Sequence, residues 1–271
     1  MEKLGASELK EKGKEFRRTI LKTIANAGSG HPGGSLSEID ILTVLYFRQM
    51  KYDAKRPDWP ERDRFILSKG HGCPGLYVVL AEAGYFPKEE LTKLRKIGSM
   101  LQGHPNNSTP GIEITTGSLG QGLSVANGIA LAGRLDKKDY KVYLILGDGE
   151  LQEGSVWEAA MTAGFKKLSN IIAIVDNNKL AQDNYVKDLK DIEPIDKKFE
   201  AFGWETQRIN GHDYEEIIDA LENAAKAKEK PQLIIADTVK GKGVSFMENQ
   251  KGWHGKAPNA EQLKQALEEL K

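Results

Sequence analysis

The sequence predicts an α/β fold, built on a mostly parallel sheet with helices on both faces. Two observations support this prediction: short β-branched segments alternate with longer segments of helical periodicity, and the strand candidates are apolar at their centres. A strand that is apolar on both faces is buried on both faces, as in a parallel sheet between two layers of helices. With 271 residues, the chain is expected to form a single domain, residues 1–271.

The predicted elements alternate regularly along the chain. A helix is expected at 8–27, where apolar residues recur at helical spacing, and a second at 36–49, opening behind Ser35. The later strands are predicted at 64–68, 141–146, 170–176, 205–209 and 232–239. The later helices are predicted at 75–83, 119–134, 155–167 and 214–228, with a short amphipathic helix in the tail, 259–271, that packs on its own domain. Long Gly- and Pro-rich loops, which often carry function, are expected at 52–60, 102–118 and 241–258.

Composition and charge exclude several classes of function. The 39 basic residues balance the 39 acidic residues, so no net charge attracts the chain to nucleic acid or to a membrane surface. The chain has no signal-peptide core and no apolar run of transmembrane length, so we expect a cytoplasmic protein. Cys73 is the single cysteine, which rules out an internal disulfide and a thiolate metal cluster within one chain.

Oxygen-bearing side chains follow two consecutive strand candidates. Asp148 stands in GDGELQEG just after the strand at 141–146, and Asn178 stands in DNNK just after the strand at 170–176. One predicted helix connects these strands as a right-handed crossover, so both side chains are expected at the same edge of the sheet. Their oxygens suit Mg²⁺, and the glycines that flank Asp148 allow backbone N–H groups to approach a phosphate. GDG alone is more often a turn, and the second motif is what favours a metal site.

Four of the five histidines lie beside glycine in Gly- and Pro-rich loops. They are His31, His71, His104 and His254. A single histidine is more often structural, but four in such loops indicate a polar site where neutral imidazoles bind hydroxyls and move protons. Zinc binding is the rival interpretation, but the spacings are wide and no thiolate or HExxH pattern accompanies them. His212, beside the expected helix cap Asp213, is predicted to be structural.

The GDGELQEG and DNNK motifs resemble the signature of thiamine diphosphate enzymes, and their context resembles the transketolase family. Five further segments match that family in order along nearly the whole chain: SGHPGGSLSEIDILTVLYF, RDRFILSKGHG, GHP, TTGSLGQGLSVANGIALAGR and KGKGVSFMENQKGWHGKAP. The resemblance covers the family's amino-terminal domain. It implies a thiamine-diphosphate-binding fold of the PP type, the type that holds the diphosphate.

The resemblance also implies roles for individual residues. It makes three residues ligands of the Mg²⁺ that bridges the two phosphates: Asp148, Asn178 through its side chain, and Leu180 through its carbonyl. Contacts to thiamine diphosphate are implied for His71, Gly117, Leu119, Gly149, Glu153 and His254. Glu153 also matches a residue of the family's subunit interface, and Leu119 matches an apolar contact to the thiazolium ring. The implied catalytic set is His31, His71, His104 and His254, of which the first and third face the sugar.

The resemblance further implies a partner chain. In the family, the catalytic glutamate lies on a separate pyrimidine-binding domain, and residues 1–271 have no counterpart to that domain or to the C-terminal domain behind it. We therefore expect the partner to be a C-terminal transketolase subunit, the substrates to be sugar phosphates and, by analogy, the assembly to be α2β2. The chain is therefore expected to be the amino-terminal half of a two-component transketolase and to be catalytically incomplete alone. The expected reaction moves a two-carbon ketol group from a ketose phosphate to an aldose phosphate.

Two alternatives stay open on the sequence. The first is that the chain is half of a related enzyme, of the deoxyxylulose-phosphate synthase or dihydroxyacetone synthase type, because such enzymes share the cofactor motifs. The segments SKGHG and GSLGQG favour transketolase over these enzymes. The second is that the chain is a non-catalytic regulator that binds the cofactor. The sugar-facing histidines argue against this alternative, because cofactor binding alone does not require them. The chain departs from the family pattern at Gln182 and Asn184, where an aliphatic residue and a glycine are common.

Overall fold

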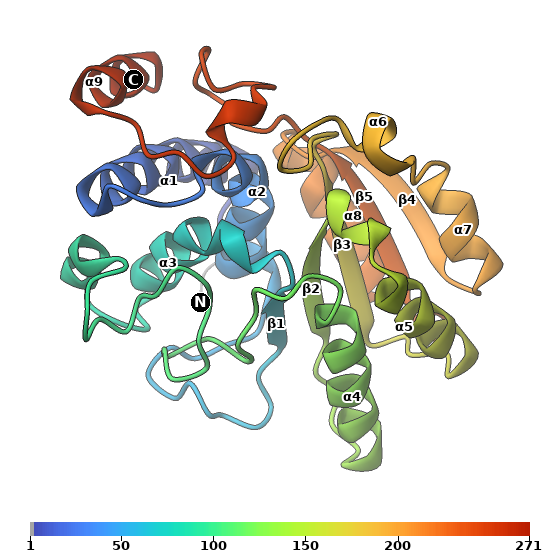
Figure 1. Ribbon diagram of the computed structural model, residues 1–271. Coiled ribbons are helices and arrows are strands. Elements are labelled where there is room, and N and C mark those ends of the chain that lie inside the picture. The colour runs from blue at the N-terminus through green and yellow to red at the C-terminus, as the bar shows by residue number, and fades with distance from the viewer. Residues whose placement is uncertain (1–2) are drawn as a thin grey trace.

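The computed structural model describes residues 3–271, which form a parallel sheet of five strands (Figure 1). The strands are β1 (Arg64–Leu67), β2 (Val142–Gly147), β3 (Ile171–Asn177), β4 (Glu205–Asn210) and β5 (Gln232–Asp237). Their spatial order is β1-β2-β3-β5-β4, and each neighbouring pair is parallel. The five predicted strands and the predicted fold class are confirmed.

Helices cover both faces of this sheet. The longer ones are α1 (Ala6–Ala27), α2 (Pro32–Val44), α3 (Cys73–Glu82), α4 (Gly122–Leu135), α5 (Gly154–Phe165), α8 (Tyr214–Ala225) and α9 (Ala260–Glu269). Figure 1 shows α1, α2 and α3 together on one side of the sheet, with α4 and α5 on the other. No helix within residues 3–271 combines the length and the apolar character needed to cross a membrane.

Alternate residues of the central strands pack into two separate cores. Ile145 of β2 and Ile174 of β3 join the core formed with α1, α2, α3 and α8. Their neighbours Leu144 and Ala173 join the other core, formed with α4 and α5. Because successive side chains of a strand point to opposite faces, both faces must be apolar when both are covered. This packing explains why β2 and β3 are apolar runs rather than alternating ones.

Two helices, α2 and α4, begin three or four residues away from their predicted starts. Helix α2 begins at Pro32, four residues before the expected start, because proline is favoured in a first helical turn. It continues into a π-helical turn, η1 (Leu45–Gln49). Helix α4 begins at Gly122 rather than at 119, because the chain first makes a turn in which Gly120 has φ +84°. In both places, glycine-rich sequence made the helix boundary hard to assign.

Several short elements were not predicted. They are α6 (Val186–Lys190), α7 (Ile195–Ala201), and the 3₁₀ turns η2 (Gly70–Gly72), η3 (Lys88–Lys93), η4 (Gly149–Gln152) and η5 (Lys251–Trp253). Segments of three to seven residues contain too few periodic positions to give a helical pattern. The tail helix α9 was predicted, and its Ala266 and Leu270 enter the core beside α1. The expectation that it packs on its own domain is therefore confirmed.

The carboxyl ends of three central strands meet at one edge of the sheet. Gly147 at the end of β2 pairs with Asp176 of β3, and Asn177 of β3 pairs with Asp237 at the end of β5. The expectation that the strands before Asp148 and Asn178 are neighbours is confirmed. Loops that follow these strands therefore begin close together, at the edge where parallel sheets bind ligands.

Gly164 of α5 lies where no side chain can fit, because a Cβ atom there would overlap the carbonyl oxygen of Phe202. We expect Gly164→Ala to lower the free energy of unfolding by about 1–3 kcal/mol through overpacking. Gly128 of α4 is the matched control, since no atom lies within 4 Å of its Cβ position. Gly128→Ala should raise the free energy of unfolding by about 0.5–1 kcal/mol. Urea unfolding of both variants tests this, and equal effects would contradict it.

Candidate active site

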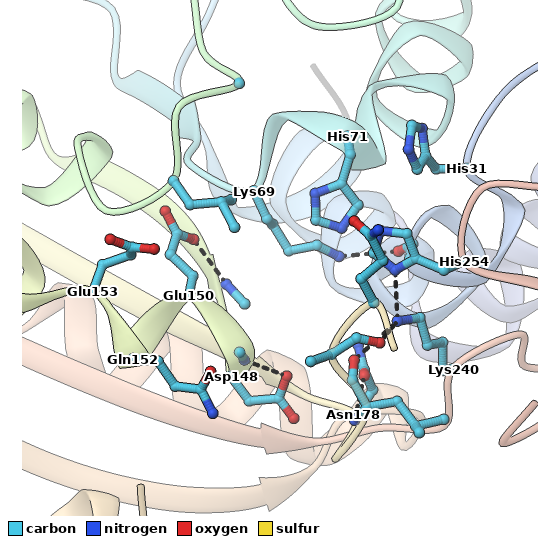
Figure 2. Close-up of a pocket in the computed structure, with 18 of the residues that line it drawn as sticks. His31, Lys69, His71, Asp148, Glu150, Gln152, Glu153, Asn178, Lys240 and His254 are labelled. Carbon is cyan, nitrogen blue, oxygen red and sulfur yellow. Dashed lines mark hydrogen bonds between the residues drawn. The ribbon is translucent and has the colours of Figure 1, made fainter. Parts of the chain in front are cut away.

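A cavity of about 470 Å³ opens at the carboxyl edge of the sheet (Figure 2). Loops that follow β1, β2, β3 and β5 all contribute to its lining. All the site residues predicted from the sequence line it: His31, His71, His104, Gly117, Leu119, Asp148, Gly149, Glu153, Asn178, Leu180 and His254. The structure thus brings the predicted residues together, while their individual roles stay predictions.

Three imidazole rings form a tight group in this cavity. The ring centroids of His71 and His254 lie 4.9 Å apart, and each lies 5.4 Å from that of His31. Figure 2 shows these rings side by side, although they come from three distant parts of the chain. The ring of His104 lies 6.0 Å from that of His31, toward the exposed side. Such a group presents several hydrogen-bonding nitrogens to one small ligand.

These imidazoles are held in the neutral form. Burial, reinforced by the positive charge of Arg95, lowers the pKa of His31 to about 4. Burial, reinforced by Lys240, lowers the pKa of His254 to about 3. Burial likewise takes the pKa of His71 well below its ordinary value. A neutral imidazole offers one donor and one acceptor, as the sugar-binding role predicted for His31 requires.

The three predicted metal ligands present oxygen atoms at the bottom of the cavity. Asn178 donates from Nδ2 to Asp176 Oδ2 at 3.2 Å, and its Oδ1 accepts from the N–H of Leu180 at 3.1 Å, which leaves one lone pair of that oxygen for a cation. Asp148 is 2% exposed, and burial, with the nearby charge of Asp176, raises its pKa to about 6. A bound cation would offset the cost of burying this carboxylate. The carbonyl of Leu180 is a third hard oxygen donor of the kind that suits Mg²⁺, and it already accepts a hydrogen bond from the ammonium of Lys240 at 2.9 Å.

The metal site would depend on more than acidic side chains. Within residues 3–271, no group of three or more His, Cys, Asp or Glu side chains is placed to hold a metal ion. A metal bound here would need the amide and the main-chain carbonyl as ligands, and would take its remaining ligands from a bound molecule or water. Gly149, a predicted phosphate contact, donates its N–H to Asp148 Oδ1 at 2.7 Å, so a phosphate oxygen would have to share that donor.

The comparison with protein families decides the family of this chain. Residues 10–270 match the model described as "Transketolase, thiamine diphosphate binding domain". The chain belongs to the transketolase family. The family predicted from the sequence motifs is thereby confirmed.

Individual transketolases match the chain along nearly its whole length. It is 47% identical to a 6-deoxy-6-sulfo-D-fructose transketolase subunit of Clostridium sp. (strain MSTE9), over 97% of this chain and 96% of that protein. It is also 47% identical to an apulose-4-phosphate transketolase subunit of Actinobacillus succinogenes, over 99% of this chain and 98% of that protein. The transketolase of Mus musculus is 44% identical over 97% of this chain, but only 42% of that protein is covered.

A solved transketolase structure shows the same fold. The enzyme of Campylobacter jejuni superposes with a TM-score of 0.93 and 39% identity, covering 98% of this chain and 43% of that one. The chain thus corresponds in length to separate transketolase subunits and to less than half of the single-chain enzymes. The prediction of an amino-terminal transketolase subunit is confirmed.

Two lysines of this transketolase subunit line the cavity but were not predicted. Lys69 donates from Nζ to Asp176 Oδ2 at 2.7 Å and to the carbonyl of Gly34 at 3.1 Å. Lys240 donates from Nζ to the carbonyl of Leu180 at 2.9 Å and lies 2.8 Å from Nδ1 of His254. Both follow a predicted strand directly, so the rule that pointed to Asp148 and Asn178 could have identified them.

Glu150 was also not predicted from the sequence, and its carboxylate forms hydrogen bonds with three segments of the site. Its Oε1 accepts hydrogen bonds from Gly120 N at 2.8 Å and from the hydroxyl of Ser68. Its Oε2 accepts from Gly147 N at 3.0 Å. One carboxylate therefore holds the GDG turn against the loops that carry Gly117, Leu119 and His71. The signal in the sequence was an acidic residue inside the GDGELQEG motif itself.

A second buried acid shares the charge of Lys69. Glu38 Oε2 lies 2.7 Å from Lys69 Nζ, and both side chains are almost fully buried. Because Lys69 also pairs with Asp176, one ammonium group forms ion pairs with two buried carboxylates. Burial is the largest cause that raises the pKa of Glu38, to about 8, against the opposing effect of Lys69. Glu38 is the acid of this cluster that takes up a proton first as the pH falls.

This pKa predicts how stability depends on pH. Since the pKa of Glu38 is raised in the folded state, its contribution to stability is present at low pH and is lost as the pH rises from about 4.5 to 8. Glu38→Gln should remove this loss, which reaches at most about 1.4 kcal/mol per pH unit. Urea unfolding between pH 5 and 8 measures it, with the exposed Glu11→Gln as control. Parallel stability curves for wild type and Glu38→Gln would contradict the assignment.

Proposed function

We propose that this chain is the cofactor-binding half of a two-component transketolase, which moves a two-carbon ketol group from a ketose phosphate to an aldose phosphate. One observation supports this most directly: a group of neutral imidazoles and a set of hard oxygen donors face the same cavity. The first suits a polyhydroxylated sugar, and the second suits the metal of a diphosphate. A pure regulator would need only the second.

The cofactors of this proposal are thiamine diphosphate and Mg²⁺. When bound, thiamine diphosphate supplies a stabilised carbanion on its thiazolium ring. Asp148, the side chain of Asn178 and the carbonyl of Leu180 would hold the metal, because they are hard oxygen donors in a buried position. Lys240 would bring a positive charge to the phosphates, because it lies beside that carbonyl and its pKa, lowered by burial to about 8, leaves it mostly protonated at pH 7.

The remaining residues would orient the reacting groups. Leu119 is an apolar side chain at the cavity, 36% exposed, and would pack against the thiazolium ring. His31 and His104 would bind sugar hydroxyls, while His71 and His254 would lie near the diphosphate. Gln182 also lines the cavity, where it replaces the aliphatic residue of the family pattern with an amide that can hydrogen-bond.

A partner chain would complete the active site. Relatives of the same length are named transketolase subunits, and 42% of the single-chain mouse enzyme is covered by this chain. We infer that a second polypeptide supplies the pyrimidine-binding domain and its glutamate, and that two copies of each form an α2β2 assembly. Glu153, exposed at the cavity, would face that partner.

The sugar substrate is proposed only by class. One relative is named for 6-deoxy-6-sulfo-D-fructose and another for apulose 4-phosphate. These sugars share an anionic group at the end away from the ketol unit, a sulfonate in one and a phosphate in the other. We therefore propose donors and acceptors that carry such a terminal anion, with pentose phosphates among them.

Removing a metal ligand should prevent cofactor binding. We expect Asp148→Ala and Asn178→Ala to weaken the affinity for thiamine diphosphate in the presence of Mg²⁺ by at least about a hundredfold, which is about 2.7 kcal/mol. Isothermal titration calorimetry measures this on the isolated chain and, if the isolated chain does not bind, on the complex with its partner. Asp188→Ala, at an exposed acid of α6, is the control. Unchanged affinity in either site variant would refute the metal assignment.

Transketolase activity should require a second polypeptide. The tagged chain is used to capture its partner from an extract of its own cells in the presence of thiamine diphosphate and Mg²⁺. The captured complex and the chain alone are then assayed with xylulose 5-phosphate and ribose 5-phosphate, and with sulfonated and branched sugars as alternative substrates. Activity should appear only in the complex. Activity of the chain alone would refute the proposed division, and a complex inactive on every pair would favour a sister enzyme or a regulator.

A further inference from the structure

Arg95 contacts the cavity histidine His31 without lining the cavity itself. Its Nη1 donates to the hydroxyl of Ser29 at 2.7 Å, and its Nη2 donates to the carbonyl of Gly103 at 3.4 Å. Nη2 also lies 3.3 Å from Nδ1 of His31. One guanidinium therefore connects the loop before α2 with the loop that carries His104.

The surroundings of Arg95 are built closely around its guanidinium. The ideal Cβ position of Gly103 lies 3.0 Å from the guanidinium carbon, so any larger residue there would press on it. The backbone of Arg95 has φ +60°, a left-handed conformation that residues with a side chain rarely adopt. Its amide donates to the carbonyl of Leu101 at 2.8 Å, which closes the loop in this conformation. Tertiary contacts, rather than local preference, hold the side chain in place.

The contact with Arg95 selects one tautomer of His31. A guanidinium has five N–H donors and no acceptor, so Nδ1 of His31 must offer its lone pair. In a neutral imidazole the proton then lies on Nε2. Among residues 3–271, no hydrogen bond to Nε2 of His31 is present, so this N–H is free for a ligand of the cavity. Burial and the charge of Arg95 both disfavour the doubly protonated form.

We propose that Arg95 is a positioning residue that fixes His31 as the Nε2-protonated tautomer and so presents one N–H donor to the sugar. The catalytic consequence rests on the proposed function, whereas the tautomer does not. With the other tautomer, His31 would present a lone pair to the cavity and would repel a carbonyl or deprotonated hydroxyl oxygen. Arg95 acts on the sugar through His31 rather than directly, because Arg95 does not itself line the cavity.

The tautomer can be observed directly, without any assay of activity. In the ¹⁵N-histidine-labelled chain, two-bond ¹H–¹⁵N correlations distinguish the tautomers, and His31→Gln assigns the signals of His31. We expect the Nε2–H form at pH 7 in wild type, a mixture of tautomers in Arg95→Met, and the Nε2–H form again in Arg95→Lys, which retains a cationic donor. An Nδ1–H form or an imidazolium in wild type would overturn the proposal, as would an unchanged tautomer in Arg95→Met.

Steady-state kinetics of the complex with its partner test the catalytic consequence. Arg95→Met should lower kcat/KM by about tenfold to a hundredfold through misorientation of His31, with cofactor affinity retained. The acid limb of the pH profile should also move to higher pH, because the pKa of His31 rises when Arg95 is lost. The other charged and titratable groups that face His31 stay in place: Lys69, His71, His104, Lys240 and His254.

Two further variants make the test independent of folding. Arg18→Met is the matched control, since Arg18 also donates to a main-chain carbonyl, that of Leu270, and neither residue lines the cavity. If Arg95→Met does not fold, Gly103→Ala replaces it, because its new Cβ would displace the guanidinium. Unchanged kcat/KM and pH profile in the folded variant would overturn the catalytic role. A complex without transketolase activity, in which wild-type His31 keeps the Nε2–H form, would overturn the proposed function but leave the tautomer standing.

Discussion

The site depends on one fully buried carboxylate, that of Asp176 near the end of β3. Its Oδ2 accepts hydrogen bonds from Lys69 at 2.7 Å, from the hydroxyl of Ser37 at 2.6 Å and from Asn178 at 3.2 Å, and its Oδ1 accepts from the hydroxyl of Thr238. These donors come from α2 and from the loops after β1, β3 and β5. A buried charge is tolerated only when it is paired and hydrogen-bonded, so Asp176 holds these elements in one arrangement. The bond to Asp176 also fixes the side-chain amide of Asn178, whose Oδ1 accepts from the N–H of Leu180 at 3.1 Å.

A second constraint concerns two of the histidines, each of which has a cationic side chain close to its Nδ1 atom. Lys240 lies 2.8 Å from Nδ1 of His254, and Arg95 lies 3.3 Å from Nδ1 of His31. A protonated lysine and an arginine can only donate, so both contacts favour imidazoles that carry their proton on Nε2. The cations also oppose protonation of the rings, since like charges repel. In that form each ring would offer one N–H donor, as a site for a hydroxylated ligand requires.

The sequence allowed the fold and much of the site to be predicted, for a topological reason. Asp148 and Asn178 were found because they directly follow apolar runs, and the carboxyl ends of parallel strands meet at one edge. Lys69 and Lys240 obey the same rule, but lysines are so often exposed that they drew no attention. Arg95 could not have been found in this way, because it follows no strand and acts through His31. The helices α6 and α7 were missed because a few residues give no periodic pattern.

The sequence by itself determined the order of the strands and the longer helices, the family, and a set of residues that the structure gathers in one cavity. These properties follow from local periodicity and from motifs, which are contiguous in the chain. Only the tertiary structure decided which nitrogen of His31 and of His254 lies against a cation, which acid takes up a proton first, and which acids pair with each lysine or arginine. Those properties depend on burial and on contacts between residues such as Lys69 and Asp176, 107 positions apart, that packing brings within hydrogen-bonding distance.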